Sequence, residues 1–184
     1  YSQAAFLAVL GCVIGGIPIT GLPPDSQQGD KVILDMLKRC GGKFKPVEGG
    51  LHFDRSLLKA TEIDLADCPD LGPILFTLGC FCSGETVIRN AGRLRLKESD
   101  RIEAMQTELQ KMGARIDVDG DTVHIQGVAL HAPNAPLSGH NDHRIVMALA
   151  VAAIASGLPA LLCGAEAVEK SWPAFWNVLR GLGA

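Results

Sequence analysis

The sequence lacks any excess of positive charge. Its 17 Lys and Arg residues are outnumbered by 20 Asp and Glu residues, which gives a formal net charge of −3. Proteins that bind nucleic acid or an anionic membrane through a bulk electrostatic field are usually basic. We therefore expect neither nucleic acid nor a membrane as a partner, and anion binding must depend on locally placed Lys and Arg side chains.

The sequence also lacks an unbroken apolar stretch long enough to cross a membrane. Its longest apolar stretch, residues 145–162, is interrupted by Ser156-Gly157 and Pro159, whereas a spanning helix needs about 20 apolar residues in a row. We interpret this stretch as a buried helix followed by a strand. With 184 residues, 47% of them hydrophobic and 20% charged, the chain is expected to fold as one domain, residues 1–184, rather than to be disordered.

Paired cysteine motifs and a glycine-rich dinucleotide loop are absent too. Without the loop, a Rossmann domain is not expected. The cysteines form no Cys-x-x-Cys pair and lie mostly in apolar segments, which predicts buried free thiols in a reducing, cytoplasmic compartment. No signal peptide is visible, and because the sequence starts at Tyr1 rather than Met, we expect upstream sequence to be missing. The six cysteines are Cys12, Cys40, Cys68, Cys80, Cys82 and Cys163.

Three segments of the sequence resemble one another at a spacing of about 70 residues. Each is an apolar, helix-length stretch that ends at glycine and is followed by a short strand-like run. The helical stretches are residues 4–16, 73–84 and 145–157, and the strand-like runs are residues 17–20, 86–89 and 159–162. Helices that are apolar on every side must be buried on every side, so three such helices are expected at the centre of the domain.

The first two copies continue in the same way. Each has an amphipathic helix, at residues 30–42 and 100–114, with apolar residues at i, i+3, i+4 and i+7 and a closing glycine. Each helix is followed by two strands, at 43–47 and 51–53, then at 115–118 and 122–125, with Asp119-Gly120 as a hairpin turn. We predict an α/β fold of three repeats, residues 1–66, 67–135 and 136–184. The third is shortened and ends in a helix near residues 172–182, and sheets and amphipathic helices surround parallel central helices.

Two charged clusters stand where helices begin. They are Lys97-Glu98-Ser99-Asp100-Arg101 and His140-Asn141-Asp142-His143-Arg144. If the central helices are parallel, their N-termini emerge on one face, where Asp70 and Lys170 also lie. Arginines beside helix N-termini bind carboxylates and phosphates, and Lys97, Arg101, Arg144 and Lys170 would supply the positive charge. Asp70 and Glu98 are candidate proton-transfer groups.

Simpler structural roles are open for the same residues. Asp100 and Asp142, and also Asp70, can be helix caps, and Arg101 and Arg144 can be their ion-pair partners. His140, Asp142 and His143 are spaced too closely to chelate well, so no metal site is expected. Trp172 and Trp176 are expected in the core rather than as a stacking platform.

The two clusters, together with Pro69-Asp70 upstream and Lys170 downstream, resemble the 5-enolpyruvylshikimate-3-phosphate synthase family. This resemblance covers essentially the whole chain, but only the C-terminal half of such an enzyme. It implies one of two similar globular domains, each made of three βαβαββ-type units, with an active site between the domains. The family transfers the enolpyruvyl group of phosphoenolpyruvate to shikimate 3-phosphate and releases phosphate, with no cofactor.

The resemblance also implies a role for each matching residue. Asp70 takes the proton of the 5-hydroxyl, and Glu98 protonates the methylene carbon of phosphoenolpyruvate. Lys97 contacts shikimate 3-phosphate, and His143 lines the phosphoenolpyruvate pocket. Arg101, Arg144 and Lys170 hold phosphoenolpyruvate, with Lys170 also counted among the catalytic residues. Arg93 stands where many relatives have a substrate-contacting asparagine, and it is kept as a candidate substrate contact.

The missing N-terminal domain is the expected protein partner of this chain. In the family that domain carries a Ser-Ser-Gln motif and further cations for the two substrates, so the isolated chain is expected to be inactive. Two alternatives remain open at this point. One is a non-catalytic anion-binding or interaction module, and the other is a domain like those of the UDP-N-acetylglucosamine enolpyruvyl transferases.

Overall fold

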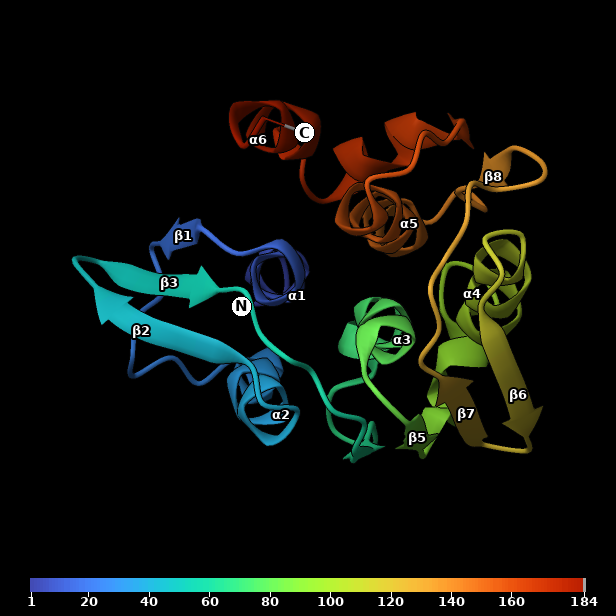
Figure 1. Cartoon of the computed structure of the whole chain (residues 1–184), viewed down its shortest axis with the longest axis horizontal. Helices are drawn as coiled ribbons and strands as arrows, with labels where there is room; N and C mark the ends of the chain where they lie inside the picture. The colour runs from blue at the N-terminus through green and yellow to red at the C-terminus, as the bar shows by residue number, and fades with distance from the viewer. Residues whose placement is uncertain (184) are drawn as a thin grey trace.

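Three helices lie side by side at the centre of the molecule in a computed structural model that describes residues 1–183. They are α1 (Ala4–Ile14), α3 (Gly72–Phe81) and α5 (His143–Ser156), seen nearly end-on in Figure 1. Their central residues are buried around the whole circumference. The prediction that the helices with no polar face form the core is confirmed.

A first sheet covers α1 on one side. It contains β1 (Ile17–Thr20), β2 (Lys43–Val47) and β3 (Gly50–Asp54), in the antiparallel order β1-β3-β2. Helix α2 (Ile33–Arg39), preceded by the 3₁₀ turn η1 (Gly29–Val32), packs beside it. The alternation in β1, where Ile17 and Ile19 are buried and Pro18 and Thr20 are exposed, fixes which face of this sheet meets the core.

A second sheet has the order β4-β5-β7-β6 and is associated with α4 (Arg101–Gln110). The predicted hairpin between β6 and β7 is confirmed, but its turn residues are Gly120 and Asp121, because Asp119 already pairs with Thr122. Strand β4 runs parallel to β5, whereas the other pairs are antiparallel. The four strands are β4 (Glu62–Asp64), β5 (Glu85–Arg89), β6 (Arg115–Asp119) and β7 (Thr122–Gln126).

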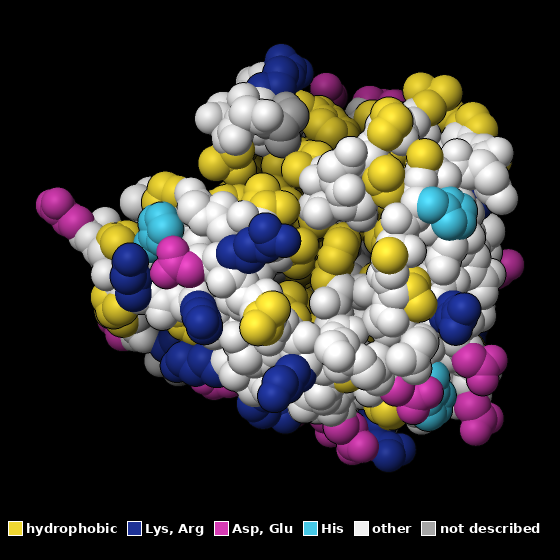
Figure 2. Space-filling model, viewed as in Figure 1, with side chains coloured by type: hydrophobic (Ala, Val, Ile, Leu, Met, Phe, Trp, Pro, Cys, Tyr) yellow, Lys and Arg dark blue, Asp and Glu magenta, His cyan; other side chains and the backbone are white. Residues whose placement is uncertain are grey.

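The remaining elements form a smaller third group. Strands β8 (Leu137–Ser138) and β9 (Leu162–Cys163) pair in parallel, and η4 (Ala165–Lys170) leads to α6 (Phe175–Gly181). Figure 2 shows hydrophobic side chains gathered in the hollow between the β1-β3-β2 sheet and α6. Two further 3₁₀ turns, η2 (Pro69–Leu71) and η3 (Ala91–Leu96), precede α3 and α4.

Glycines inside two central helices allow the close packing of helix on sheet. A β-carbon at Gly11 would lie 2.6 Å from Cβ of Phe53 on β3, and one at Gly79 would lie 3.0 Å from Cγ2 of Ile125 on β7. Glycine normally weakens a helix interior, so close approach of the backbone explains why it stands there. Thr77 of α3 donates a hydrogen bond to the carbonyl of Ala148 on α5, which ties the helices together at 3.1 Å.

The N-terminal ends of the three central helices meet. Arg144, in the first turn of α5, donates to the carbonyl of Asp70 just before α3. Residues Ser2 and Gln3 at the start of α1 line one groove together with His143 and Arg144. This is the arrangement that the sequence predicted for parallel helices.

Several helix and strand boundaries differ from the prediction, including two near the C-terminal end. The strand expected at residues 159–162 is reduced to Leu162–Cys163, because Pro159 cannot donate a backbone hydrogen bond and Leu161 points to solvent with 65% exposure. The last helix begins at Phe175 rather than near Trp172, so Pro173 lies outside its first turn. Trp172 and Trp176 pack against the core on either side of the buried Phe175, as expected.

All six cysteines are free, and all but Cys163 are buried. Buried thiols were predicted for most of them, and this is confirmed. Among residues 1–183, no helix combines the length and apolar character that crossing a bilayer requires.

Candidate functional site

Aspartates cap the two helices that carry the charged clusters. Asp100 accepts hydrogen bonds from the backbone N–H groups of Ile102 and Glu103, both at 3.1 Å. Asp142 accepts one from the N–H of Arg144 at 2.9 Å. The predicted caps are confirmed, and each places the arginine that follows it in the first turn of a helix.

The most buried charge pair joins the two clusters. Arg101 is 2% exposed and Asp142 is fully buried. Nε of Arg101 donates to Oδ2 of Asp142 at 2.8 Å, and Nη2 donates to Oδ1 at 3.2 Å, while Ser99 donates to Oδ2 at 3.1 Å. Burial raises the pKa of Asp142, but Arg101 and these hydrogen bonds outweigh burial and hold the pKa below its usual value. The predicted structural role of Arg101, as the ion-pair partner of an aspartate, is therefore confirmed.

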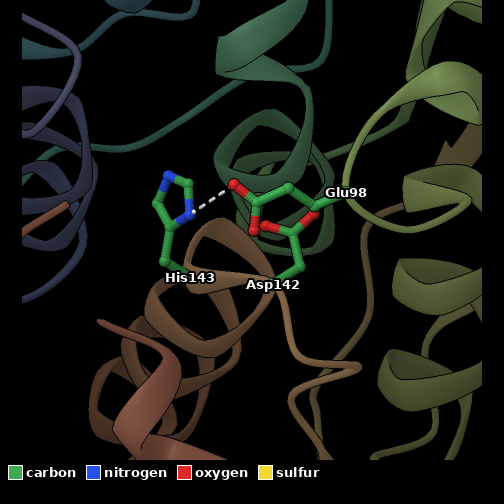
Figure 3. Close-up of side chains that lie close together, drawn as sticks. All are labelled: Glu98, Asp142 and His143. Carbon is green, nitrogen blue, oxygen red and sulfur yellow. Dashed lines mark ion pairs between the residues drawn. The ribbon is translucent and has the colours of Figure 1, made fainter. Parts of the chain in front are cut away.

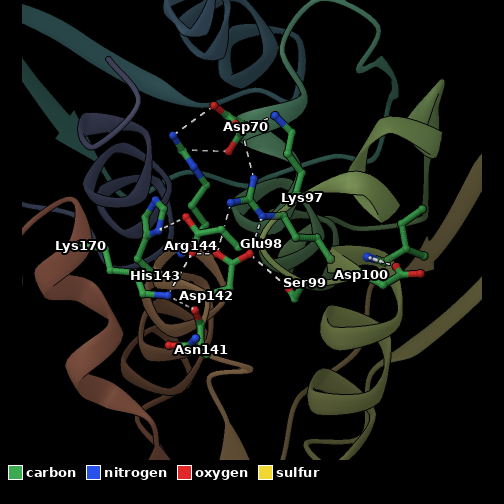
Figure 4. Close-up of polar contacts among 12 residues, drawn as sticks. Asp70, Lys97, Glu98, Ser99, Asp100, Asn141, Asp142, His143, Arg144 and Lys170 are labelled. Atoms are coloured by element: carbon green, nitrogen blue, oxygen red, sulfur yellow. Dashed lines mark hydrogen bonds and ion pairs between the residues drawn. The ribbon is translucent and has the colours of Figure 1, made fainter.

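Asp70 is surrounded by three cations (Figure 4). Its carboxylate lies 3.1 Å from Nζ of Lys97, 3.1 Å from Nη1 of Arg101 and 3.3 Å from Nη2 of Arg144. Burial raises the pKa of Asp70, and the combined effect of Arg144, Lys97 and Arg101 exceeds it, so the net pKa is lowered. Asp70 is not a cap, because its side chain binds cations contributed by two other segments.

Glu98 lies in a second group of contacts at the start of α5. Its Oε2 is 3.5 Å from Nζ of Lys170, and its Oε1 is 3.1 Å from Nδ1 of His143 (Figure 3). The contact to His143 is close but poorly aligned for a hydrogen bond. Lys170 also donates to the carbonyl oxygen of Asn141. A carboxyl group, an imidazole and an ammonium group are thus held within reach of one another.

The donor atoms of Glu98, Asp142 and His143 lie within 4.8 Å of one another, a spacing that a metal ion could use. Both carboxylate oxygens of Asp142 are already engaged by Arg101, and one also accepts from Ser99. A metal would have to compete with a buried guanidinium, which argues against metal binding by these three residues.

Seven of the eight predicted site residues belong to this charged cluster, which consists of one group of contacts around Asp70 and a second around Glu98. Arg93, the eighth, donates instead to the carbonyl of Ala66 at 3.1 Å. The other seven are Asp70, Lys97, Glu98, Arg101, His143, Arg144 and Lys170. A groove of about 530 Å³ between the starts of α1 and α5 shares His143 and Arg144 with the cluster.

Sequence reasoning missed one buried charge near the site, Glu108 of α4, which is 2% exposed. It stands seven residues after Arg101, on the same face as the buried Met105 and Met112. A carboxylate on the apolar stripe of an amphipathic helix was the signal available in the sequence. The hydrogen bond that the Asn141 carbonyl accepts from Lys170 depends on backbone geometry and left no such signal.

A sequence model of the EPSP synthase (3-phosphoshikimate 1-carboxyvinyltransferase) family matches residues 1–179. This chain belongs to the EPSP synthase family. The UDP-N-acetylglucosamine branch is accordingly not favoured. The match extends over the three central helices and both charged clusters.

Curated relatives of the chain carry the name of the same family. The chain is 40% identical over 183 residues to 3-phosphoshikimate 1-carboxyvinyltransferase of Clostridium kluyveri, covering 100% of this chain and 43% of the relative. It is 43% identical to the Clostridium acetobutylicum protein of the same name, covering 42% of it, and 39% identical to that of Methanocaldococcus jannaschii, covering 43% of it. The chain therefore spans less than half the length of the curated relatives that it matches.

Solved structures support the same family and fold. EPSP synthase from Acinetobacter baumannii aligns with a TM-score of 0.78 at 26% identity, covering 97% of this chain and 44% of that protein. The enolpyruvyl transferase NikO from Streptomyces tendae aligns with a TM-score of 0.71 at 21% identity, over 100% of this chain and 42% of that protein. The second likeness concerns the fold alone.

Proposed function

We propose that this chain supplies one half of an active site that transfers the enolpyruvyl group of phosphoenolpyruvate to the 5-hydroxyl of shikimate 3-phosphate and releases phosphate. The observation that carries the proposal is that Lys97, Arg101 and Arg144 meet at Asp70, while Lys170 lies beside Glu98 at the start of the same helix as Arg144. Both substrates carry phosphate and carboxylate groups, which Arg and Lys beside helix N-termini bind well. Counting Asp142, the cluster has four cations and three carboxyl groups, so it retains one positive charge for an anion when all three are ionised and two when Glu98 carries a proton.

Arg144 and Lys170 are the cations best placed to receive phosphoenolpyruvate. Arg144 has 14% of its side chain exposed and Lys170 has 41%, whereas Arg101 has 3% and is already bound to two carboxylates. We infer that Arg101 mainly holds Asp70 and Asp142 in place while it adds to the positive field. Lys97, with 27% exposure, can bind shikimate 3-phosphate.

Asp70 and Glu98 have different surroundings and therefore different proposed roles. A carboxylate held by three cations is a weak base, so Asp70 suits orientation of the 5-hydroxyl better than strong proton abstraction. Glu98 lies against His143 and Lys170, a position from which it can deliver a proton to the methylene carbon. General acid catalysis of this kind contributes about 10²- to 10⁴-fold to a rate.

We also propose that the chain is one domain of three repeats, as the sequence pattern suggested for residues 1–66, 67–135 and 136–184. The order of elements supports this, because α1-β1-α2-β2-β3 recurs as α3-β5-α4-β6-β7. Strand β4 pairs with β5, so within this proposal the first boundary fits better before residue 62 than at residue 66.

The remaining cations that bind the two substrates are proposed to come from an N-terminal domain. Without that domain, the chain is proposed not to turn over substrate. Titration of this chain with phosphoenolpyruvate, followed by backbone NMR shifts, tests the binding part. We expect weak binding with shifts centred on residues 97–101 and 141–144 and at Lys170. Shifts that inorganic phosphate reproduces in full would favour a non-catalytic anion-binding module, and shifts elsewhere would contradict the proposed site.

A further inference from the structure

The turn that leads into α5 has an unfavourable backbone conformation. Both of its central residues, His140 and Asn141, have left-handed φ angles, 49° and 51°, and the N–H of Asp142 donates to the carbonyl of Gly139 at 2.8 Å. Two positive φ angles in succession are the geometry of a type I′ turn. Residues with a β-carbon adopt left-handed φ angles uncommonly, although Asn and His do so more readily than most. Contacts from the surrounding structure are therefore expected to stabilise this turn.

Glu108 of α4 provides several of those contacts, in addition to the hydrogen bonds that the N–H of Gly139 donates to the carbonyl of Cys163 at 2.8 Å and the N–H of His140 donates to Oγ of Ser138 at 3.2 Å. Its Oε2 accepts hydrogen bonds from the N–H of Ser138 at 2.8 Å and from Nζ of Lys111 at 2.7 Å. Its Oε1 lies 3.1 Å from Nε2 of His140. One buried carboxylate thus binds both the residue that precedes the turn and the first of its two left-handed residues.

The turn at residues 139–142 also positions groups of the charged cluster. The carbonyl of Asn141 accepts a hydrogen bond from Lys170, Asp142 binds Arg101, and Arg144 reaches Asp70 from the next residues of α5. Helix α4 therefore holds this segment at two points, through Arg101 at its start and through Glu108 two turns later. Of these two, Glu108 fixes the turn itself.

We propose that Glu108 is a positioning residue of the anion site. It acts through Ser138 and His140 to hold the turn at residues 139–142, so that the Asn141 carbonyl and the first turn of α5 meet Lys170 and Asp70. This inference rests on the proposed function for its link to anion binding. It assigns a purpose to a buried carboxylate that lies outside the cluster described above.

Glu108→Gln tests the inference because it keeps the size of the side chain and removes its charge. We expect the amide signals of residues 139–144 to shift and hydrogen exchange of the Asp142 N–H to become about tenfold faster. The Kd for inorganic phosphate should rise about threefold or more. Glu103→Gln is the matched control, an exposed carboxylate on the same helix, and it should change neither quantity.

The outcomes separate positioning from simple stabilisation. A Glu108→Gln protein that melts earlier, yet keeps the Asp142 exchange rate and the phosphate Kd, would overturn the inference. If the unmodified chain does not bind phosphate, the proposed anion site is wrong, and the exchange rate alone then decides whether Glu108 holds the turn.

A second variant applies if Glu108→Gln does not fold. His140→Asn places at this position a residue that tolerates the left-handed conformation but cannot make the imidazole contact to Glu108. We expect faster exchange of the Asp142 N–H and a phosphate Kd raised about twofold, a smaller effect because the Ser138 contact remains. Unchanged exchange and affinity in this variant would also overturn the inference.

Discussion

The buried pair of Arg101 and Asp142 shows how single residues at this site combine stability with proposed function. Each side chain is at most 3% exposed, and each is satisfied chiefly by the other. Breaking a buried pair leaves an uncompensated charge, which costs about 3–5 kcal/mol. Exposed pairs contribute far less to stability. The burial of an ion pair therefore affects stability more than the distance between its two charged groups.

Arg101→Met is therefore expected to lower the free energy of unfolding by about 3–5 kcal/mol in urea denaturation. Arg89→Met is the matched control, because Arg89 pairs with Glu62 at the surface, and it should leave the unfolding midpoint nearly unchanged. Equal midpoints for the two variants would show that Asp142 is not buried as described.

Asp142 also predicts a pH dependence. Its pKa is lower in the folded chain than in the unfolded chain, because Arg101 and its hydrogen bonds outweigh the effect of burial. Its stabilising contribution is thus present above the unfolded value of about 3.9 and is lost as the pH falls through the lower folded value. Asp142→Asn should be less stable than the unmodified chain at pH 7, and the difference should shrink below about pH 4. A difference that stays constant between pH 7 and pH 3 in urea unfolding would contradict this account.

At the scale of elements, the helix starts determine where the charged side chains lie. Asp100 and Asp142 were predictable as caps because each stands directly before an apolar periodic run, and the capping bonds are observed. Convergence of the clusters also required parallel central helices, a condition that the pattern of fully apolar segments does not determine by itself. The prediction of a strand at residues 159–162 was wrong in its bounds. A run of four apolar residues that includes a proline does not determine which residues pair with a neighbouring strand. The left-handed turn at His140-Asn141 depends on a distant carboxylate that local pattern does not reveal.

The capping interactions of α4 can be tested independently of the charge pair. Asp100→Ala removes the acceptor for two backbone N–H groups, and loss of such a cap costs about 1 kcal/mol. We expect a correspondingly lower unfolding midpoint in urea, with Asp100→Asn retaining most of the stability because its amide oxygen can still accept. A midpoint unchanged in Asp100→Ala would mean that the helix start is held by other contacts.

For the whole molecule, family membership and length both support the proposal that this chain forms only part of an active site. The chain aligns along its full length with relatives more than twice as long, and the cations of its charged cluster pair with carboxylates of the same chain. The mixed α/β class, the core helices and the clustering of seven of the eight candidate residues could be predicted from the sequence, because they follow from periodicity and motifs. The role of Arg93 and the purpose of Glu108 could not, because both depend on contacts between segments distant in the sequence.

The proposed division of the active site is tested most directly by phosphate release from phosphoenolpyruvate and shikimate 3-phosphate. The assay compares this chain alone with a chimaera in which it replaces the matching part of the Clostridium acetobutylicum relative, which is 43% identical. We predict no turnover by the chain alone, turnover by the chimaera, and a loss of about 10²-fold or more when the chimaera carries Glu98→Gln, with Glu103→Gln as the neutral control. Turnover by the chain alone, or a folded Glu98→Gln chimaera as active as its parent, would contradict the account.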